Sequence, residues 1–472
     1  MNIKYRKVLR YAFIFLAQYH ILWCLMYPYL WKLPYQAFEQ WFALVLLIAA
    51  IICFVIRIRK DPAEGARTLK KLRRMCSFEQ IFVIALLLWY IIDCAMHTQW
   101  QMGSTFEAND WRLFLTWLVA FVYFPFAEVS GAKDAKRNIE RIIHTTVLIY
   151  GTFCAWVVWK YLHMDYVTFL SGRKLSMTET VSMRVGTNQN ITAAHAAVMI
   201  ALCIYMIATQ KKKIRILYVP VCFVFLTVAM LTNSRASYGS ALCIIALSVF
   251  IYLWKRGGLQ NLFQKLPFSE KFSNKMSIRI LIVSCIAVAG GLVVFLMRRA
   301  SFAVLQYGVN SSSTDSIDAQ GAMRTLDLSL NHRDGIWIAA VEVLKSSPRN
   351  FLLGVLPSNV GQALLDTGLV TKNFPHCHNL LVQVAVSLGV PAMILFIMFL
   401  SSLFIRCVRI LIAQDKRYVN AWVISIVLLC LVILDVMEAY LFANGRVNLP
   451  FFYMFAGWIV ALDRSYTDRY KR

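Results

Sequence analysis

Two histidines and a cysteine occupy three consecutive positions, His376, Cys377 and His378, in a chain that has only 8 His and 12 Cys. These residue types could bind a metal ion together, or one imidazole could act alone as a base. Adjacent side chains point about 100° apart on a helix and to opposite faces of a strand, so the three cannot easily converge on one ion. A single working histidine is therefore favoured, with a metal site as the alternative.

The continuous apolar run from Leu380 predicts that a helix begins directly after His378. The dipole at a helix amino terminus disfavours the imidazolium form and keeps the ring neutral. A neutral imidazole can accept a proton from a hydroxyl group. His378 is therefore a candidate base, and the alternative is a histidine that caps the helix or packs at the membrane interface.

Several arginines stand where they could bind an anionic ligand. Arg235 lies in TNSRAS, a turn of a few residues between two apolar runs, and Arg184 and Arg446 also lie close to the ends of such runs. Arg333 is followed four residues later by Trp337, so both point to one face of a helix. The planar guanidinium group matches phosphate oxygens. The alternative is that each arginine reaches toward lipid headgroups.

The composition is that of a membrane protein. Hydrophobic residues make up 59% of the 472 positions and charged residues 15%, which leaves too little polar surface for a soluble protein of this size. About 20 apolar residues span a bilayer as a helix, and twelve stretches approach this length. We therefore predict an all-α polytopic membrane protein, a single integral membrane domain over residues 1–472. The predicted spans are about 11–31, 41–56, 78–96, 111–130, 142–162, 190–209, 216–232, 237–254, 280–297, 379–405, 420–442 and 449–462.

The positive charges predict the orientation of these spans. Every second loop is basic, including RIRKDPAEGARTLKKLRR and QKKKIR, whereas the first loops on the other side are nearly free of Lys and Arg. Basic loops remain in the cytoplasm, so both termini are predicted to be cytoplasmic. The net charge of +25 is then an orientation signal aided by membrane lipids, and it requires no nucleic acid partner.

Cysteine usage gives no sign of a disulfide framework. Nearly all the cysteines fall within predicted spans or on the cytoplasmic side, and only Cys377 clearly faces outward. Cys377 is therefore expected to react with a membrane-impermeant thiol reagent.

One outer segment, residues 298–378 between spans nine and ten, is long enough to form structure of its own. Residues 332–347 within it carry apolar side chains at helical spacing, and a Ser-Ser-Pro sequence ends the pattern. This predicts an amphipathic helix at the outer membrane surface. The residues that give the spacing are Ile336, Ala339, Ala340, Val343 and Leu344.

Three acids within the predicted spans, Asp93, Asp435 and Glu438, favour a competing hypothesis. Ionisable groups at membrane depth are typical of transporters and proton relays. A supporting role in ion pairs with the outer arginines is at least as consistent with their positions. An internal repeat, which would favour a transporter, is not evident.

Four stretches, in order along the chain, resemble motifs of the O-antigen ligase and polymerase superfamily of glycan transferases. They are GTNQN before span six, TNSRAS around Arg235, RDGIW followed by PRNFLLG, and His378 with Asn379 followed nine residues later by Gly389. The region that bears them is about 184–400. Family members often have Gly-x-Gly after the proline, whereas here Gly354 is followed by Val355 and Leu356.

The resemblance implies an inverting, metal-independent glycosyltransferase without a cofactor, in the bacterial cytoplasmic membrane. It would join a glycan carried on undecaprenyl pyrophosphate to an acceptor hydroxyl on a lipid or a glycan, with its active site facing outside. Arg235 and Arg333 would bind the pyrophosphate, and His378 would orient or deprotonate the acceptor. A polysaccharide polymerase of the same superfamily is the nearest alternative, and a flippase or transporter a more distant one. The expected substrate-binding residues are Arg184, Asn190, Trp337, Asn379 and Arg446.

Overall fold

The structure is a computed structural model, and the part of the chain that it describes is mostly helical. The described residues are 77–99, 132–163, 167–170, 174–177, 183–185, 189–232, 333–374, 376–412, 421–436 and 448–470, with single positions among 14–26, 45–48, 110–127 and 241–248 and at 165. The predicted sites Arg235, Glu438 and Arg446 lie outside these residues, as do the side chains of Arg184, Asn190 and Asp435.

The chain divides into two compact units. Unit one comprises Met1–Thr146, Leu328–Arg409 and Leu431–Arg472, and unit two comprises Val147–Asp327 and Ile410–Cys430. The prediction of one integral membrane domain over residues 1–472 stays a prediction.

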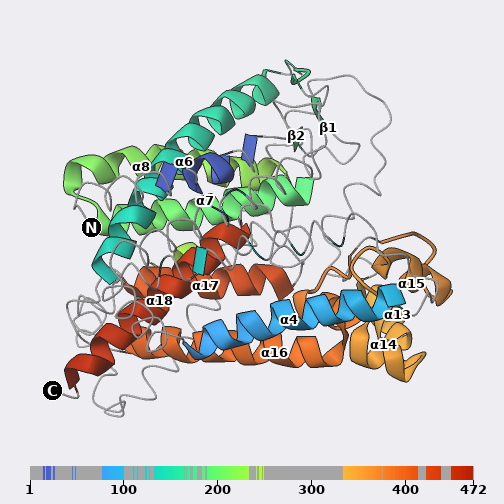
Figure 1. Cartoon of the computed structure of the whole chain (residues 1–472). Helices are drawn as coiled ribbons and strands as arrows, with labels where there is room; N and C mark the ends of the chain where they lie inside the picture. The colour runs from blue at the N-terminus through green and yellow to red at the C-terminus, as the bar shows by residue number, and fades with distance from the viewer. Residues whose placement is uncertain are drawn as a thin grey trace, which may run out of the picture. The chain divides into compact units, whose positions relative to one another are not determined.

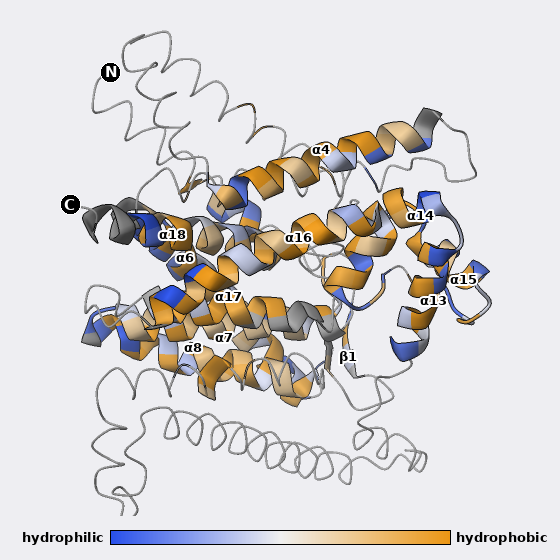
Figure 2. Ribbon diagram, turned by 90° about the horizontal axis from the view of Figure 1, so that it is seen from below, coloured by the Kyte–Doolittle hydropathy of each residue, from blue (hydrophilic) through white to orange (hydrophobic). Residues whose placement is uncertain are grey.

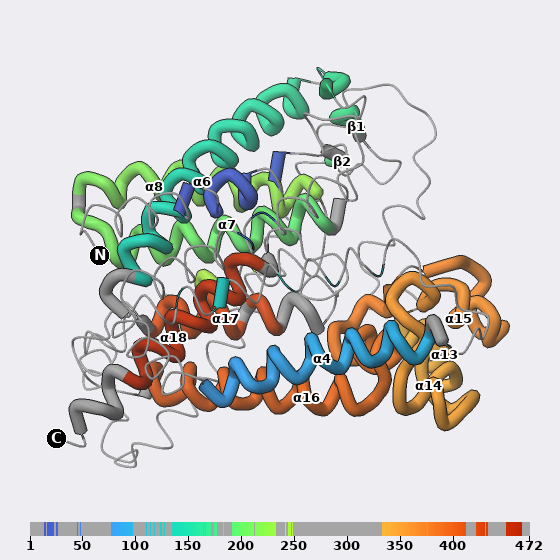
Figure 3. Tube along the Cα trace, viewed as in Figure 1, coloured from blue at the N-terminus to red at the C-terminus, as the bar shows by residue number. Residues whose placement is uncertain are grey.

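The regular elements in the described part of unit one are helices, and the longest of them run side by side (Figure 1). The three short helices between Arg333 and Asp366 lie at the end of α16 where that helix begins, and the tube in Figure 3 follows them into it. The helices are α4 (Phe78–Gln99), the first part of α6 (Ala132–Leu162), α13 (Arg333–Lys345), α14 (Pro348–Leu353), α15 (Val360–Asp366), α16 (Leu380–Ile412), the end of α17 (Ala421–Val436) and α18 (Asn448–Tyr470).

Unit two is built around the hairpin of α7 (Gln189–Thr209) and α8 (Lys212–Leu231), which pack along each other. Alanines on α7 are buried, so the two backbones approach closely. Gly151 on α6 meets α8, where an added Cβ would lie 2.6 Å from Val221 Cγ1. Before α7, the antiparallel strands β1 (Leu175–Met177) and β2 (Met183–Val185) pair in register, with Ser176 opposite Arg184.

Five of the described helices are long and apolar enough to cross a membrane. Helices α4, α7, α8 and α16 coincide with the spans predicted at 78–96, 190–209, 216–232 and 379–405. The fifth helix, α6, coincides in its later part with the span predicted at 142–162. Figure 2 shows these helices largely hydrophobic, with more hydrophilic residues on α13, α14 and α15. The prediction of a helical membrane protein is confirmed. The count of twelve stays a prediction, because the spans predicted at 11–31, 41–56, 111–130, 237–254 and 280–297 lie outside the described residues or are described only at single positions.

Helix α16 is interrupted at Gly389, whose φ of 83° and ψ of 166° are not helical. Pro391 follows and has no N–H to donate to the preceding turn. An unpaired carbonyl costs several kcal/mol in a bilayer, so the groups freed by the break need other donors. The indole Nε1 of Trp89 on α4 donates to the Leu388 carbonyl at 2.8 Å.

The segment after α14 supplies the remaining donors. Val355 N donates to the Val386 carbonyl at 2.9 Å, and Leu356 N donates to the Ser387 carbonyl at 3.0 Å. Donors from the segment after α14 and from one side chain of α4 therefore pair the carbonyls at the break in α16. These bonds fix α14 and the segment after it against α16.

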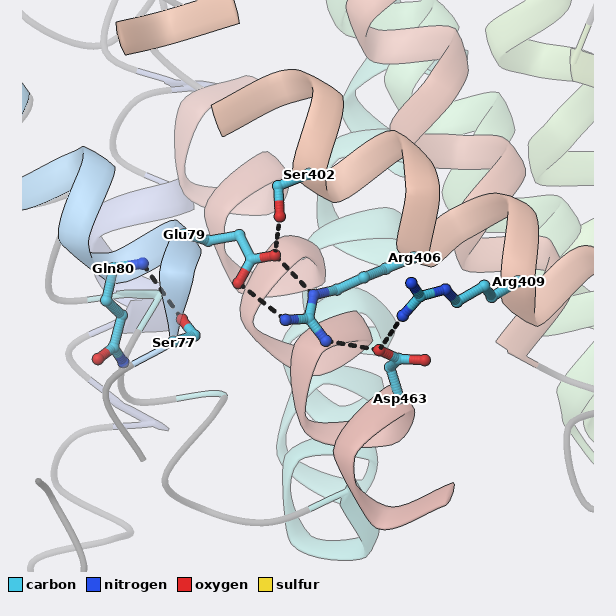
Figure 4. A network of polar contacts seen from close by, with 7 residues as sticks. All are labelled: Ser77, Glu79, Gln80, Ser402, Arg406, Arg409 and Asp463. Atoms are coloured by element: carbon cyan, nitrogen blue, oxygen red, sulfur yellow. Dashed lines mark hydrogen bonds and ion pairs between the residues drawn. The ribbon is translucent and has the colours of Figure 1, made fainter. Parts of the chain in front are cut away.

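A buried ion-pair network joins α4, α16 and α18 near the carboxyl-terminal end of α16 (Figure 4). Arg406 donates from Nε to Glu79 Oε1 at 2.6 Å and from Nη1 to Asp463 Oδ2 at 2.5 Å. The Ser402 hydroxyl also donates to Glu79, whose side chain is fully buried. Arg409 Nη1 lies 3.8 Å from Asp463 and is largely exposed. One arginine therefore links three helices.

We expect Arg406→Met to lower the free energy of unfolding by about 3–5 kcal/mol, because it leaves the buried carboxylate of Glu79 without its charged partner and leaves Asp463 with Arg409 alone. The matched control is Arg409→Met, which removes an exposed ion pair worth at most about 1 kcal/mol. Thermal unfolding of the detergent-solubilised protein measures both. Equal shifts in melting temperature for the two variants would show that the buried network does not join the helices.

Candidate functional site

Helices α13 and α15, the segment after α15 and the first turns of α16 enclose a small apolar core, which we call the loop core. The face of α13 that carries the apolar spacing is buried here, and α13 lies within the helix predicted at 332–347. Its apolar face packs on protein, and its position at the outer membrane surface stays a prediction. The buried residues of the loop core are Ile336, Ala339, Ala340, Val343, Val360, Leu364, Val370, Cys377 and Val386.

Cys377 is held in the loop core by its side chain and by both of its backbone groups. Its side chain is fully buried. The indole Nε1 of Trp337 donates to its carbonyl at 3.0 Å, and its own N–H donates to Gln383 Oε1 at 2.7 Å. Gln383 Nε2 in turn donates to the Ser387 hydroxyl at 2.9 Å. Cys377 is therefore an anchor of the turn.

His378 follows in a left-handed backbone conformation, with φ of 50°. Such a conformation costs a residue other than glycine about 1–3 kcal/mol, and it persists only where the surroundings impose it. The ring centroids of His376 and His378 lie 4.0 Å apart, and the rings meet edge to face. Both imidazoles are partly exposed, whereas the thiol between them lies in the loop core.

Asn379 caps α16. Its Oδ1 accepts from the N–H groups of Leu381 and Val382 at 3.0 and 3.1 Å. An asparagine at this position satisfies donors that the first helical turn leaves unpaired. The prediction that a helix begins after His378 is confirmed. The Asn379 side chain has a structural task in addition to any contact with substrate.

The expectation that Cys377 reacts with a thiol reagent is wrong. The side chain is buried, and this burial raises the pKa of the Cys377 thiol to about 12. The reactive thiolate is therefore scarce at neutral pH. The position of the residue in a predicted outer loop was a poor guide to its exposure, because the turn directs its side chain into the loop core. Within the described residues, no group of three His, Cys, Asp or Glu side chains could hold a metal ion.

We expect Lys372→Cys to be labelled by an impermeant maleimide in intact spheroplasts, because Lys372 is exposed in the same loop. Cys377 in the parent protein should stay unlabelled until a denaturant is added. Mass spectrometry of the loop peptide measures both. Labelling of Cys377 in the folded protein would contradict the buried turn, and an unlabelled Lys372→Cys variant would contradict the predicted orientation.

Two glycines of the family-like motifs allow the loop and α16 to cross. A Cβ on Gly354 would lie 2.6 Å from the carbonyl carbon of Ser387, and one on Gly389 would collide with the Leu352 carbonyl. Both glycines have positive φ, 73° and 83°. Leu356, which stands where the family often has a second glycine, also has a positive φ of 66°. The burial of its side chain offsets the strain.

We expect Gly389→Ala to destabilise the protein by more than about 3 kcal/mol, since it combines a backbone clash with a conformation that only glycine adopts readily. The matched control is Gly335→Ala, because Gly335 lies inside α13 and an added Cβ there meets nothing within 4 Å. That variant should be neutral or slightly stabilising. Fluorescence-detected size-exclusion after a temperature series measures both, and a stable Gly389→Ala protein would refute the tight crossing.

Two buried acids lie where α4 meets the loop. His97 Nδ1 lies 3.1 Å from Asp93 Oδ1, so the acid considered for transport is paired within its own helix. Asp110 accepts from the backbone N–H and the hydroxyl of Ser358 at 2.9 and 2.6 Å, which fixes the turn before α15. Asp110 therefore has structural partners, whereas Asp93 lies next to His97 in its own helix.

The structure brings one group of the predicted site residues together in unit one. Arg333 is the first residue of α13, and Trp337 follows one turn later and bonds to the residue before His378. Arg184 lies in β2 and Asn190 in α7, both in unit two. The part of the site that the structure describes is therefore the loop core with the histidine turn, residues 376–379.

Gln383 and Ser387 were not among the predicted site residues. They lie four residues apart on one face of an otherwise apolar helix, and both are buried. Paired polar residues at this spacing in a membrane span are a signal of a specific internal contact. Asp110 and Trp89 had no comparable signal, because their partners are distant in the sequence.

Comparison with protein families matches residues 220–397 to the family described as O-Antigen ligase. The matched segment includes Arg235, α13, the histidine turn and the break in α16. No curated protein matches the chain. The motifs predicted from the sequence and the family match agree, and residues 220–397 are similar to the O-antigen ligase family.

Proposed function

We propose that the protein transfers a glycan from undecaprenyl pyrophosphate to an acceptor hydroxyl, as an inverting, metal-independent transferase without a cofactor. The observation that carries the proposal is the loop core, in which α13, beginning at Arg333, is bonded through Trp337 to the turn that presents His378. A guanidinium and an imidazole from two separate family-like motifs thus belong to one small folded element. The family match supports the same class of reaction.

In the proposed reaction, the acceptor oxygen forms a bond to the anomeric carbon of the donor while the bond from that carbon to the pyrophosphate oxygen breaks. His378 takes the proton from the acceptor hydroxyl. The leaving group is undecaprenyl pyrophosphate, and its negative charge grows as the bond breaks. Arg333 and Arg235 stabilise that charge, with Arg184, Asn190 and Arg446 as further donor-binding residues.

The proposed site faces outside the bacterial cytoplasmic membrane, and both termini face the cytoplasm. The basic loops of the sequence support this orientation. A donor that is activated by its own lipid carrier suits a compartment without nucleotide sugars. The partners are then the lipid-linked glycan, a lipid or glycan acceptor and the surrounding membrane lipids.

The purified protein in liposomes, supplied with lipid-linked glycan and an acceptor, tests the proposal. We expect acceptor-linked glycan and released undecaprenyl pyrophosphate in equal amounts, with no effect of a chelator. Consumption of the donor without an acceptor product would contradict transfer to a hydroxyl. Movement of intact donor across the bilayer without product would favour the transporter alternative, which rests on Asp93, Asp435 and Glu438.

A polymerase of the same superfamily is the second candidate, because its acceptor is a second lipid-linked glycan and its chemistry is the same. The glycan profile of a deletion strain separates the two. Single repeat units on the carrier would identify a polymerase. Long unattached chains would identify a ligase.

A further inference from the structure

We propose that Trp337 and Gln383 are positioning residues that fix the direction of the His378 imidazole by holding the Cys377 backbone from both sides. The inference rests on the proposed function of His378 as the base, and it assigns Trp337 a different task from the substrate contact expected from the sequence. Gln383 has no role in the reaction as proposed above.

Two side chains fix the backbone of Cys377 by hydrogen bonds. Trp337 Nε1 donates to its carbonyl at 3.0 Å, and Gln383 Oε1 accepts from its N–H at 2.7 Å. Gln383 is itself fixed, because it is buried and its Nε2 donates to the Ser387 hydroxyl at 2.9 Å. The Cys377 side chain fills a place in the loop core. Neither backbone group of this residue can rotate without losing one of these two hydrogen bonds.

Asn379, on the other side of His378, is also fixed by hydrogen bonds. The Asn379 side chain accepts from the N–H groups of Leu381 and Val382, and the Asn379 carbonyl accepts from Gln383 N at 2.9 Å. His378 thus lies between two residues whose backbones are held by hydrogen bonds, and it adopts a φ of 50° there.

A fixed backbone around His378 matters for the proposed reaction. A base must lie within hydrogen-bond reach of the proton that it accepts, and a misplacement of about 1 Å can lower a rate a hundredfold. A fixed backbone on both sides of His378 meets this requirement. The indole and amide groups act through His378 and do not need to touch the substrate.

The test uses Trp337→Phe and Gln383→Leu in the full-length protein in liposomes. Phenylalanine keeps the aromatic packing and removes the donor, and leucine keeps the volume and removes the acceptor. We expect kcat to fall about 10–100-fold in each, with the KM for the lipid-linked donor within about threefold of the parent value. The matched control is Trp89→Phe, which removes an indole bond of 2.8 Å to another carbonyl of α16 and should leave kcat within about threefold.

Two further variants separate positioning from general damage. Gln383→Glu keeps an oxygen acceptor for the Cys377 N–H and should restore most of the kcat lost in Gln383→Leu. In a His378→Ala background, Trp337→Phe should cause no additional loss, because a residue that acts only through His378 has nothing left to position.

The outcomes distinguish this inference from the proposed function. If His378→Ala is inactive while Trp337→Phe and Gln383→Leu keep the parent kcat, the positioning role is overturned and the proposed function stands. If Trp337→Phe raises the KM for the donor at unchanged kcat, Trp337 binds substrate and the inference is overturned. If His378→Ala itself is fully active, the proposed role of His378 fails.

Discussion

Replacement of His378 by alanine is expected to lower transfer activity by about two to four orders of magnitude, the range typical for loss of a general base. The physical reason is that, in the proposed reaction, the acceptor hydroxyl loses the group that takes its proton. The protein should remain folded, because the His378 side chain is partly exposed and lies outside the loop core. Initial rates with the lipid-linked donor measure the effect.

The neighbouring positions provide the controls. Cys377→Ala removes the thiol and keeps a small apolar side chain in the loop core, and His376→Ala removes the ring that contacts His378. Both should retain activity within about tenfold. A metal site would give a different pattern, in which a chelator inactivates the enzyme, zinc restores it and all three positions matter equally. That pattern would refute a single working histidine.

Replacement of Arg333 by alanine is expected to lower transfer by about a thousandfold or more, while the amount of protein in the membrane stays near normal. A fixed guanidinium stabilises the charge that grows on the leaving pyrophosphate, and the loss of one such group commonly costs two to three orders of magnitude or more. Arg235→Ala should behave alike. Lysine should restore little activity at either position, because it lacks the planar fork of donors.

The matched control for Arg333 is Lys345→Ala, at the other end of the same helix. Lys345 is exposed and pairs with Glu342 at 3.3 Å, so its removal takes one positive charge from α13 without touching the loop core. Activity should be unchanged. Full activity in the lysine variants of both arginines would mean that a diffuse positive field is sufficient, and the proposed pyrophosphate contacts would then be wrong.

Local patterns predicted the elements that carry the site. The spacing of Ile336, Ala339 and Val343 predicted α13, and the apolar run after His378 predicted the start of α16. Both follow from the helical period, which depends only on neighbours in the sequence. The family-like spacing also selected His378 over His376.

Contacts between distant segments could not be read in the same way. The indole of Trp89 and the N–H of Leu356 complete the broken helix from positions far away in the chain. The inward direction of Cys377 was also missed, because no periodicity sets side-chain directions in an irregular turn. The departure from the family pattern at Leu356 is accommodated by burial, which the sequence did not reveal.

The break in α16 has a consequence for hybrid proteins assembled from related transferases. The segment after α14 supplies backbone donors to the first turns of α16, and glycines on both sides allow the close approach. A loop taken from one relative and joined to the membrane helices of another would leave carbonyls exposed to lipid wherever the two did not match. Residues 333–391 should therefore be exchanged as one block, with a junction after Pro391 and never between the loop and the histidine turn.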